Sequence, residues 1–217
     1  MPPKFAIIIP AFNEAATIGR VVAAALTYGF AIVVDDGSRD ETAAVAKMNG
    51  ADVTIHPVNR GYDNALNSGF RRAAELGCLY AVTLDADGQH NPDLIAKFFT
   101  ALEQGNDVVI GIRDRRQRFA EHIFAWVTNS LWGVKDPLCG MKGYRMSVYD
   151  RLGHFDSFGS IGTELALFAA RNELRVAQIT IPTLDRIGSS RFGSVVSANF
   201  RIFRALFLVL WGKRPSP

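Results

Sequence analysis

Two carboxylates stand two residues apart directly after an apolar run. The run, 79–84, contains Tyr, Val and Thr and is typical of a buried strand, and Asp85-Ala86-Asp87 follows it. Side chains that leave a strand at the carboxyl edge of a parallel sheet lie where open α/β folds bind ligands. Mg²⁺ is typically held by one or two carboxylates together with substrate phosphates. The triplet therefore predicts a metal-phosphate site, with an acidic turn before a helix as the alternative.

A second acidic pair, Asp35-Asp36, ends the apolar run 30–34. In a parallel sheet both pairs would lie at one edge, where one pair can accept hydrogen bonds from a nucleoside and the other can hold a metal on a diphosphate. Two negative pairs facing an anionic ligand need a cation between them. Neither G-x-G-x-x-G after the first strand nor G-x-x-x-x-G-K-[ST] occurs, which disfavours a dinucleotide oxidoreductase and a P-loop NTPase.

The segments that must position these residues alternate between strand-like and helix-like. This alternation predicts an α/β fold with a mostly parallel central sheet covered by helices on both faces. Ser38 and Glu41 form a capping-box pattern for a helix that ends at Met48. The expected strands are 5–10, 30–34, 53–55, 79–84, 108–110, 142–146 and 176–181. The other expected helices are 17–26, 64–76, 92–103, 119–132, 163–171 and 195–211.

The composition is that of a globular protein of 217 residues, 48% hydrophobic and 21% charged. A net charge of +3 is too small to argue for nucleic acid, and we expect no nucleic-acid partner. Cys78 and Cys139 fit neither a disulfide framework nor a zinc spacing, which favours reduced thiols in the cytoplasm. We expect no signal peptide, and no stretch approaches the roughly 20 apolar residues that span a bilayer.

Four segments together resemble the inverting family 2 glycosyltransferases, which have the GT-A fold. They are, in order along the first half, IIIPAFNE at 7–14, VVDDGS at 33–38, NRG at 59–61 and LDADGQH at 84–90. The resemblance implies transfer of a hexose from a GDP- or UDP-linked sugar with Mg²⁺ or Mn²⁺. It implies a single catalytic domain over 1–217, with a nucleotide-sugar half at 1–112, an acceptor half at 113–193, and an interfacial helix and tail at 194–217.

Within that family the chain is most similar to polyprenyl-phosphate sugar synthases of the dolichyl-phosphate mannose synthase type. The narrower likeness rests on Gln89 and on the segments 136–145 and 186–191. The chain also departs from the usual patterns. Where the family usually shows D-x-x-S-G-F-R, this chain has Asp136, Cys139-Gly140 and then Tyr144-Arg145, and Tyr62 replaces the Lys that often follows N-x-G. These departures leave the donor and the acceptor open.

By this resemblance the nucleotide pocket contains residues of the loops after three strands: Pro10, Ala11, Asn13, Glu14, Asp36, Asp85 and Ala86. Asp85, Asp87 and Gln89 resemble the metal-binding residues of the family. Of these three, Asp87 is the residue least needed by a turn. Without the family, Asn13 and Glu14 would simply begin a helix, and Asp35 or Gln89 would cap a local turn or helix.

Arg113 and Arg118 belong to an arginine-rich run after the fifth expected strand. A charge run is usually a solvated loop, but arginine pairs bidentately with phosphate, so we expect these two to contact phosphates. We expect the same of Arg186 and Arg191, which flank a Gly-Ser-Ser loop; an ordinary polar loop is the alternative. Asp136 and Arg145 are interpreted alternatively as a pair that holds a turn.

Glu164 separates two mechanisms. A hydroxyl acceptor needs a general base, and Glu164 lies near where many family members place one, although a carboxylate also suits a helix start. A phosphate monoester needs no base, because its second pKa is about 6. The arginines favour the phosphate acceptor and an in-line displacement with inversion at the sugar C1. The predicted catalytic set is Asp87, Arg113, Arg118, Arg186, Arg191 and Glu164.

The expected last helix, 195–211, interleaves aromatic and aliphatic residues with Arg201 and Arg204. This composition predicts an amphipathic helix that holds the protein peripherally at the cytoplasmic face of a membrane. The alternatives are docking on its own core or on a separate transmembrane subunit. Two other functions stay open: transfer to a saccharide or other hydroxyl, and a non-catalytic nucleotide-sugar-binding module, against which the intact Asp-x-Asp argues.

Overall fold

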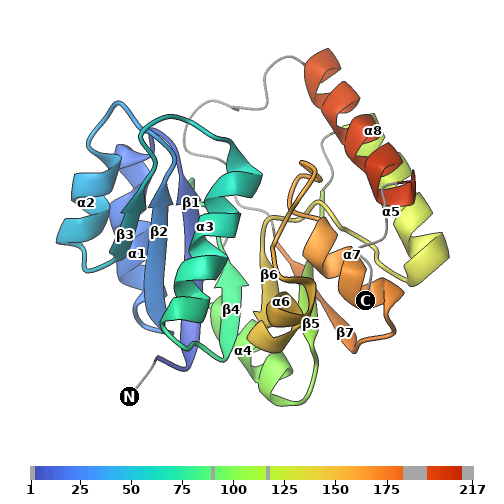
Figure 1. The fold of residues 1–217 in the computed structure, drawn as a ribbon, viewed down its shortest axis with the longest axis horizontal. Coiled ribbons are helices and arrows are strands. Elements are labelled where there is room, and N and C mark those ends of the chain that lie inside the picture. Colours follow the sequence, from blue (N-terminus) through green and yellow to red (C-terminus); the bar gives the residue numbers. More distant parts are fainter. Residues whose placement is uncertain (1–2, 89–90, 116–117, 183–194, 212–217) are drawn as a thin grey trace.

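One seven-stranded mixed sheet organises the chain (Figure 1). A computed structural model describes residues 3–88, 91–115, 118–182 and 195–211. Within these residues the strands lie in the order β3-β2-β1-β4-β6-β5-β7. Their bounds are β1 Phe5–Ala11, β2 Phe30–Asp35, β3 Asp52–Ile55, β4 Tyr80–Thr83, β5 Val108–Arg113, β6 Lys142–Arg145 and β7 Val176–Ile181.

Strand direction places the ends of several strands at one edge. β1 is parallel to β2 and β4, whereas β6 is antiparallel to both β4 and β5, so that β5 runs in the same direction as β4. The chain order reverses between β1 and β4, because β2 and β3 lie on one side of β1 and β4 on the other. Such a reversal is where α/β sheets bind ligands. Asp85 and Asp87 follow β4 at this point, as the sequence predicts.

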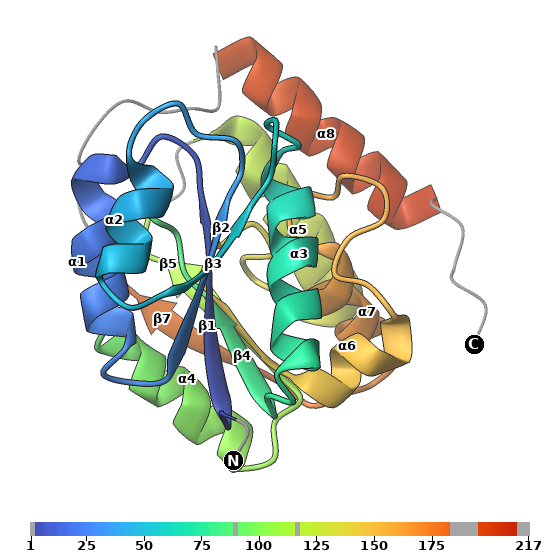
Figure 2. The same ribbon diagram turned by 60° about the vertical axis from the view of Figure 1, so that its left-hand side comes forward.

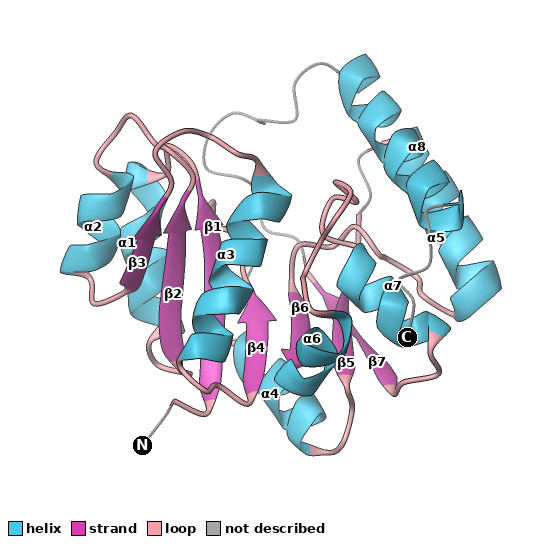
Figure 3. Ribbon diagram, viewed as in Figure 1, coloured by secondary structure: helices cyan, strands magenta, loops and turns pink. Residues whose placement is uncertain are grey.

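Helices cover both faces of the sheet, which confirms the expected layered α/β fold (Figures 2 and 3). One layer contains α1, α2 and α4, and the other contains α3, α5, α6, α7 and α8. Alternate residues of β1 divide between the two cores: Ile7 and Ile9 pack with the first layer, Ala6 and Ile8 with the second. The bounds are α1 Ala15–Ala25, α2 Thr42–Met48, α3 Tyr62–Glu75, α4 Leu94–Glu103, α5 Phe119–Trp132, α6 Met146–Leu152, α7 Glu164–Arg171 and α8 Val195–Trp211.

The predicted capping box of Ser38 and Glu41 is wrong. The helix begins only at Thr42, and Ser38 Oγ accepts a hydrogen bond from the Asn13 N–H at 2.8 Å instead. The side chain that holds the first turn is Asp40, whose Oδ1 accepts from the Thr42 N–H at 3.1 Å. The local pattern misled because Ser38 is committed to a loop 25 residues away. The short helix α6 was also not predicted, since its first residue, Met146, was assigned to a strand.

Candidate active site

The loops after β1 and β2 are fastened to each other. The Arg39 N–H donates to Asn13 Oδ1 at 2.8 Å, and the Glu14 N–H donates to Thr42 Oγ1 at 2.7 Å. Asn13 adopts a left-handed backbone with φ 51°, a conformation that asparagine tolerates better than most residues. Two of the residues predicted to bind a nucleoside thus lie against the acidic loop after β2, and the β1 pair Pro10 and Ala11 leads into them.

The Asp35-Asp36-Gly37 turn has a strict local geometry. Asp35 Oδ1 accepts from the Ser38 N–H at 3.0 Å, so its role as a cap of this turn is confirmed. The Asp36 N–H donates to Ala11 O at 2.8 Å and joins the turn to the end of β1. Gly37 has φ 75°, and a Cβ there would lie 2.6 Å from the Asn59 backbone nitrogen. Only glycine allows the Asn59 segment to approach this closely.

Asp36 organises the N-R-G segment. Its buried carboxylate accepts from the Arg60 N–H at 2.9 Å and the Gly61 N–H at 2.7 Å, and lies 2.7 Å from His56 Nδ1. The other ring nitrogen of His56 lies 2.9 Å from Ser68 Oγ, inside the fold. His56 is therefore structural. The nucleoside contact of Asp36 stays a prediction, and the network explains how the carboxylate is held at this edge.

Asp85 is enclosed by residues from two other segments. Its Oδ1 lies 3.4 Å from the Tyr62 hydroxyl, and a Cβ on Gly140 would lie 2.2 Å from its Oδ2. Thr83 Oγ1 donates to Gly140 O at 2.6 Å, which fastens the 136–142 segment to the end of β4. Gly140 is therefore a position where any side chain would collide with the Asp85 carboxylate.

The donor set at this edge fits a divalent cation that shares its coordination with a ligand. Asp87 is buried and Asp85 is half-buried, with Ala86 buried between them. In the described part of the chain no group of three or more His, Cys, Asp or Glu side chains could hold a metal alone. Two carboxylates completed by diphosphate oxygens match the usual Mg²⁺ arrangement. Gln89, the third predicted ligand, lies outside the described residues.

Lys142 is a buried lysine that was not predicted from the sequence. Its Nζ donates to Cys139 O at 2.6 Å and to Gly162 O at 3.0 Å, and burial lowers the pKa of this amine. It joins the 136–142 segment to the 160–163 loop. The signal was present: read without a gap, D-P-L-C-G-M-K puts Lys142 where the usual family pattern has its final arginine.

Arg113 and Asp136 form an ion pair that was not predicted from the sequence. Arg113 Nε and Nη2 each lie 2.9 Å from a different Asp136 oxygen, and the Arg113 N–H also donates to Asp136 Oδ2 at 3.0 Å. The interpretation of Asp136 and Arg145 as a pair is wrong. Arg145 instead lies 3.6 Å from Asp107 Oδ1, because it stands at the opposite end of β6 from Lys142.

A small cavity of about 60 Å³ brings Arg113 and Arg118 together. Glu121 lies between them, with its Oε1 2.9 Å from Arg118 Nη1 and its Oε2 3.2 Å from Arg113 Nη2. The rest of the lining is apolar and comes from three separate segments: Leu138, Ile161 and Ile202. The two predicted phosphate-binding arginines thus lie side by side at the end of β5, beside hydrocarbon. Arg186 and Arg191 lie outside the described residues.

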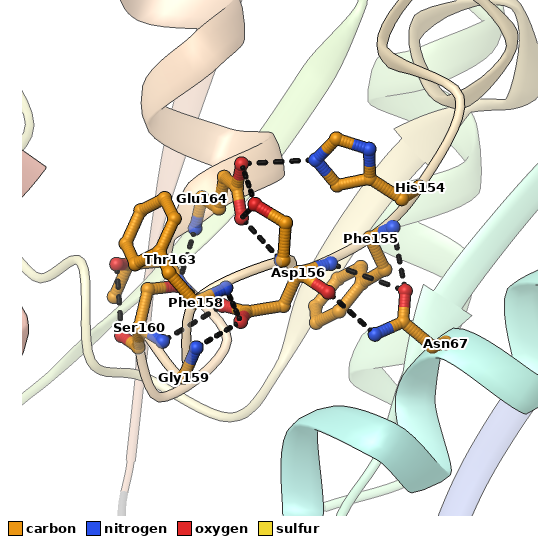
Figure 4. Close-up of polar contacts among 10 residues, drawn as sticks. Asn67, His154, Phe155, Asp156, Phe158, Gly159, Ser160, Thr163 and Glu164 are labelled. Atoms are coloured by element: carbon orange, nitrogen blue, oxygen red, sulfur yellow. Dashed lines mark hydrogen bonds and ion pairs between the residues drawn. The ribbon is translucent and has the colours of Figure 1, made fainter. Parts of the chain in front are cut away.

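Glu164, the first residue of α7, sits in a polar network (Figure 4). Its carboxylate accepts from the Ser157 N–H at 2.5 Å and lies 2.9 Å from His154 Nε2. The same loop is held by Asp156, whose Oδ1 accepts from the Phe158 and Gly159 N–H groups. Glu164 is thus a buried carboxylate that orients a half-buried imidazole and a serine.

Comparison with known proteins identifies glycosyltransferases as relatives of this chain. The model of glycosyl transferase family 2 matches residues 6–125. A UDP-N-acetylglucosamine–dolichyl-phosphate N-acetylglucosaminyltransferase from Methanococcus voltae is 29% identical over 241 residues, covering 95% of this chain and 96% of that protein. An undecaprenyl-phosphate 4-deoxy-4-formamido-L-arabinose transferase from Pseudomonas aeruginosa is 34% identical over 166 residues, covering 67% of this chain but only 48% of the relative.

The fold also matches solved structures. Glucosyl-3-phosphoglycerate synthase from Mycobacterium tuberculosis, in complex with Mn²⁺, UDP and glucosyl-3-phosphoglycerate, has a TM-score of 0.76 at 21% identity, covering 98% of this chain and 81% of that one. At this identity the likeness concerns the fold. The family match covers more than half of the chain, including the acidic loops after β2 and β4. The chain therefore belongs to glycosyl transferase family 2, and is a glycosyltransferase with a GT-A fold.

Proposed function

We propose that this glycosyltransferase moves a hexose from a nucleoside-diphosphate sugar to a polyprenyl phosphate, with inversion and with a divalent metal. The cavity beside β5 is the observation that carries the proposal. It combines two arginines, which are held by Glu121, with apolar Leu138, Ile161 and Ile202. A phosphate attached to a hydrocarbon would use both kinds of contact. The cavity's volume of about 60 Å³ is far below the roughly 300–1,000 Å³ of typical small-molecule sites, so it suits a small head group.

The names of two relatives support the same acceptor class. The Methanococcus voltae protein acts on dolichyl phosphate, and the Pseudomonas aeruginosa protein acts on undecaprenyl phosphate. The first of them also uses a UDP-sugar, and UDP is bound in the structurally similar synthase. A UDP-sugar is therefore our first choice of donor, and a GDP-sugar the second.

The donor would lie across the carboxyl ends of β1, β2 and β4. Asn13, Glu14 and Asp36, with Pro10 and Ala11, would surround the nucleoside. Asp85 and Asp87, with Gln89, would hold Mg²⁺ or Mn²⁺, which when bound neutralises charge on the departing diphosphate. Gly140 and Tyr62 would keep the Asp85 carboxylate directed toward the ligand.

The acceptor would need orientation more than activation. A phosphate monoester is largely dianionic at neutral pH and attacks without a general base. Arg113 and Arg118 would hold it for in-line attack on the sugar C1, with Glu121 and Asp136 keeping the two guanidinium groups in place. Arg186 and Arg191 are proposed as further phosphate contacts. Glu164 would then support the loop 153–163 rather than remove a proton.

The test is transfer from a panel of UDP- and GDP-sugars to polyprenyl phosphate in the presence of Mn²⁺. We expect one donor to give a lipid-linked sugar, and we expect EDTA or Asp87→Ala to abolish the product. Asp150→Ala, at an exposed aspartate on α6, is the matched control and should retain activity. Absence of transfer from every donor to polyprenyl phosphate, with donor hydrolysis intact, would refute the proposed acceptor.

A second candidate is transfer to a saccharide or other hydroxyl, which the pairing of His154 with Glu164 favours. An imidazole oriented by a buried carboxylate is a common form of general base. Under this alternative, Glu164→Gln and His154→Ala should each lower kcat by about 100-fold or more. Under the lipid-phosphate proposal, transfer by folded protein should change little in His154→Ala.

A further inference from the structure

Helix α8 has two chemically different faces. One face is buried against the rest of the molecule and consists of Ala198, Ile202, Ala205, Leu206 and Val209. The other face exposes Phe200 (70%), Phe203 (39%), Phe207 (59%) and Trp211 (70%). The rings of Phe207 and Trp211 are stacked, with centroids 5.0 Å apart. The helix is therefore docked on its own core and still presents a row of aromatic side chains outward.

Helix α5 repeats this arrangement. Phe119 and Trp126, seven residues apart and hence on the same side of the helix, are each 71% exposed. Ala120, Phe124 and Thr128 on the opposite side are buried. Large aromatic side chains are costly to leave in water, so two such rows call for a common explanation.

The two helices lie side by side and run in the same direction (Figures 1 and 2). Near their beginnings, the Ala120 N–H of α5 donates to Asn199 Oδ1 of α8 at 3.4 Å. Near their ends, the Arg171 guanidinium lies over the Trp132 ring at 4.4 Å and donates to Val209 O. The exposed rows are thus neighbours, and we call them the aromatic face: Phe119, Trp126, Phe200, Phe203, Phe207 and Trp211.

The charge around the aromatic face is positive. Arg201 and Arg204 are exposed beside the aromatic row of α8. Neither helix exposes a carboxylate within its described side chains; Glu121 is buried between Arg113 and Arg118. Aromatic side chains with flanking arginines are the composition of surfaces that enter the interface of an anionic bilayer.

The cavity lies on the inner side of these two helices, behind the aromatic face. Glu121 of α5 and Ile202 of α8 both line it, and Arg118 immediately precedes Phe119. No helix within the described residues is long and apolar enough to cross a membrane, so contact through these helices would be at the surface.

We propose that the aromatic face docks on an anionic lipid bilayer, with α5 and α8 together in the plane of the interface. This inference rests on the proposed lipid-phosphate acceptor, and it adds the surface and the orientation with which the enzyme would meet that acceptor. The cavity would then lie behind the docked helices, and Arg118, which lines it, immediately precedes Phe119 of the aromatic face.

The experiment is flotation of the full-length protein with two kinds of phosphatidylcholine vesicle. One kind contains about 30% of the anionic lipid phosphatidylglycerol, and the other contains none. We expect binding that depends on the anionic lipid and weakens with salt. Phe207→Ala/Trp211→Ala and Phe119→Ala/Trp126→Ala should each reduce binding by about 10-fold or more. Met48→Ala/Leu79→Ala, which removes two exposed apolar side chains outside α5 and α8, should bind normally.

Tryptophan fluorescence tests whether both helices take part. The chain has three tryptophans, Trp126, Trp132 and Trp211. In a Trp132→Phe background, brominated lipids should quench both Trp211→Phe, through Trp126, and Trp126→Phe, through Trp211. Quenching of Trp211 alone would refute the two-helix face. No flotation of the wild-type protein, or dimerisation in solution that the same double variants abolish, would refute membrane docking.

Activity separates this proposal from the proposed function. With a short, water-soluble isoprenyl phosphate and no vesicles, both double variants should keep wild-type transfer. If transfer persists but the wild type does not bind vesicles, the docking surface is refuted and the function stands. If vesicles bind through the aromatic face but no isoprenyl phosphate is glycosylated, the function is refuted and the docking surface stands.

Discussion

The Asp85 carboxylate has little freedom, because its neighbours come from two other parts of the chain. Tyr62 begins α3, Gly140 lies in the segment before β6, and Thr83 in β4 fastens that segment in place. At the scale of single residues, the site therefore depends on side chains that need not touch the ligand. Two substitutions test this dependence.

Gly140→Ala should weaken binding of UDP with Mn²⁺ by about 10-fold or more, because the new methyl group would meet Asp85 Oδ2. Isothermal titration calorimetry measures this, and circular dichroism checks the fold. Gly19→Ala on α1 is the matched control, since its Cβ would meet side-chain atoms of Asn49 at 3.0 Å and Val45 at 3.2 Å rather than Asp85, and alanine favours its helix. Equal affinity in Gly140→Ala and wild type would contradict the assignment of Asp85.

Tyr62→Phe should raise the Mn²⁺ concentration needed for half-maximal activity by about 2- to 10-fold, the effect of one modest hydrogen bond. Burial and then Asp85 raise the pKa of the Tyr62 phenol, so that the hydroxyl stays protonated and can donate to Asp85. Tyr28→Phe removes a comparable tyrosine–aspartate contact at the surface and should leave the metal requirement unchanged.

At the scale of elements, two segments without regular structure carry the site, and each is tied to an element by a carboxylate. Asp136 ties the segment before β6 to the end of β5 through Arg113. Asp63, in the first turn of α3, accepts from the Ile161 and Gly162 N–H groups and ties the loop 153–163 to that helix. Ion pairs and hydrogen bonds thus hold these two segments in place at the edge of the sheet.

Asp136→Asn should lower the free energy of unfolding by about 3–5 kcal/mol, because it leaves a largely buried Arg113 without its main counter-charge. Urea unfolding provides the measurement. Asp52→Asn, which breaks the more exposed pair with Arg72, should cost only about 0–1 kcal/mol. Similar costs for the two variants would mean that the Arg113 pair does not hold the segment.

Asp63 predicts a specific pH dependence. Burial and then the charge of Asp156 raise the pKa of Asp63 to about 6, above its unfolded value of about 3.9. The folded state therefore binds the extra proton, and this contribution to stability is complete below about pH 4 and lost as the pH rises through about 6. The stability of Asp63→Asn relative to wild type should accordingly increase from pH 4 to pH 7 in urea unfolding. If the difference in stability between Asp63→Asn and wild type did not vary with pH, the raised pKa of Asp63 would be refuted.

At the scale of the whole molecule, ligand binding and stability are linked across the sheet edge. UDP with Mn²⁺ at about 100 times its Kd should stabilise the protein by about 2.7 kcal/mol. For a chain of this size that raises Tm by about 5–10 °C in a thermal shift assay. UDP with EDTA should give a smaller shift, and Asp87→Ala should lose the difference that Mn²⁺ makes. An equal shift with and without metal would contradict a metal site at Asp87.

Much of the architecture could be predicted because it depends on local patterns. The bounds of α5, β7 and α8 match the expected ones, since apolar periodicity marks a buried face regardless of the partner. The Ser38 capping box failed for the opposite reason: the motif was local, but the partner of Ser38 lies in another loop. The partners of Asp136 and Arg145 were missed in the same way.

The sequence by itself determined the layered α/β fold, the acidic loops at two strand ends and the family. These follow from short-range periodicity and from motifs whose residues are contiguous. Only the tertiary structure decided that Asp36 holds the N-R-G segment, that Lys142 joins two loops, and that Arg113 and Arg118 share a cavity with hydrocarbon. The physical reason is distance along the chain: buried charges take partners wherever folding supplies them, here up to 99 residues away, as between Asp63 and Gly162.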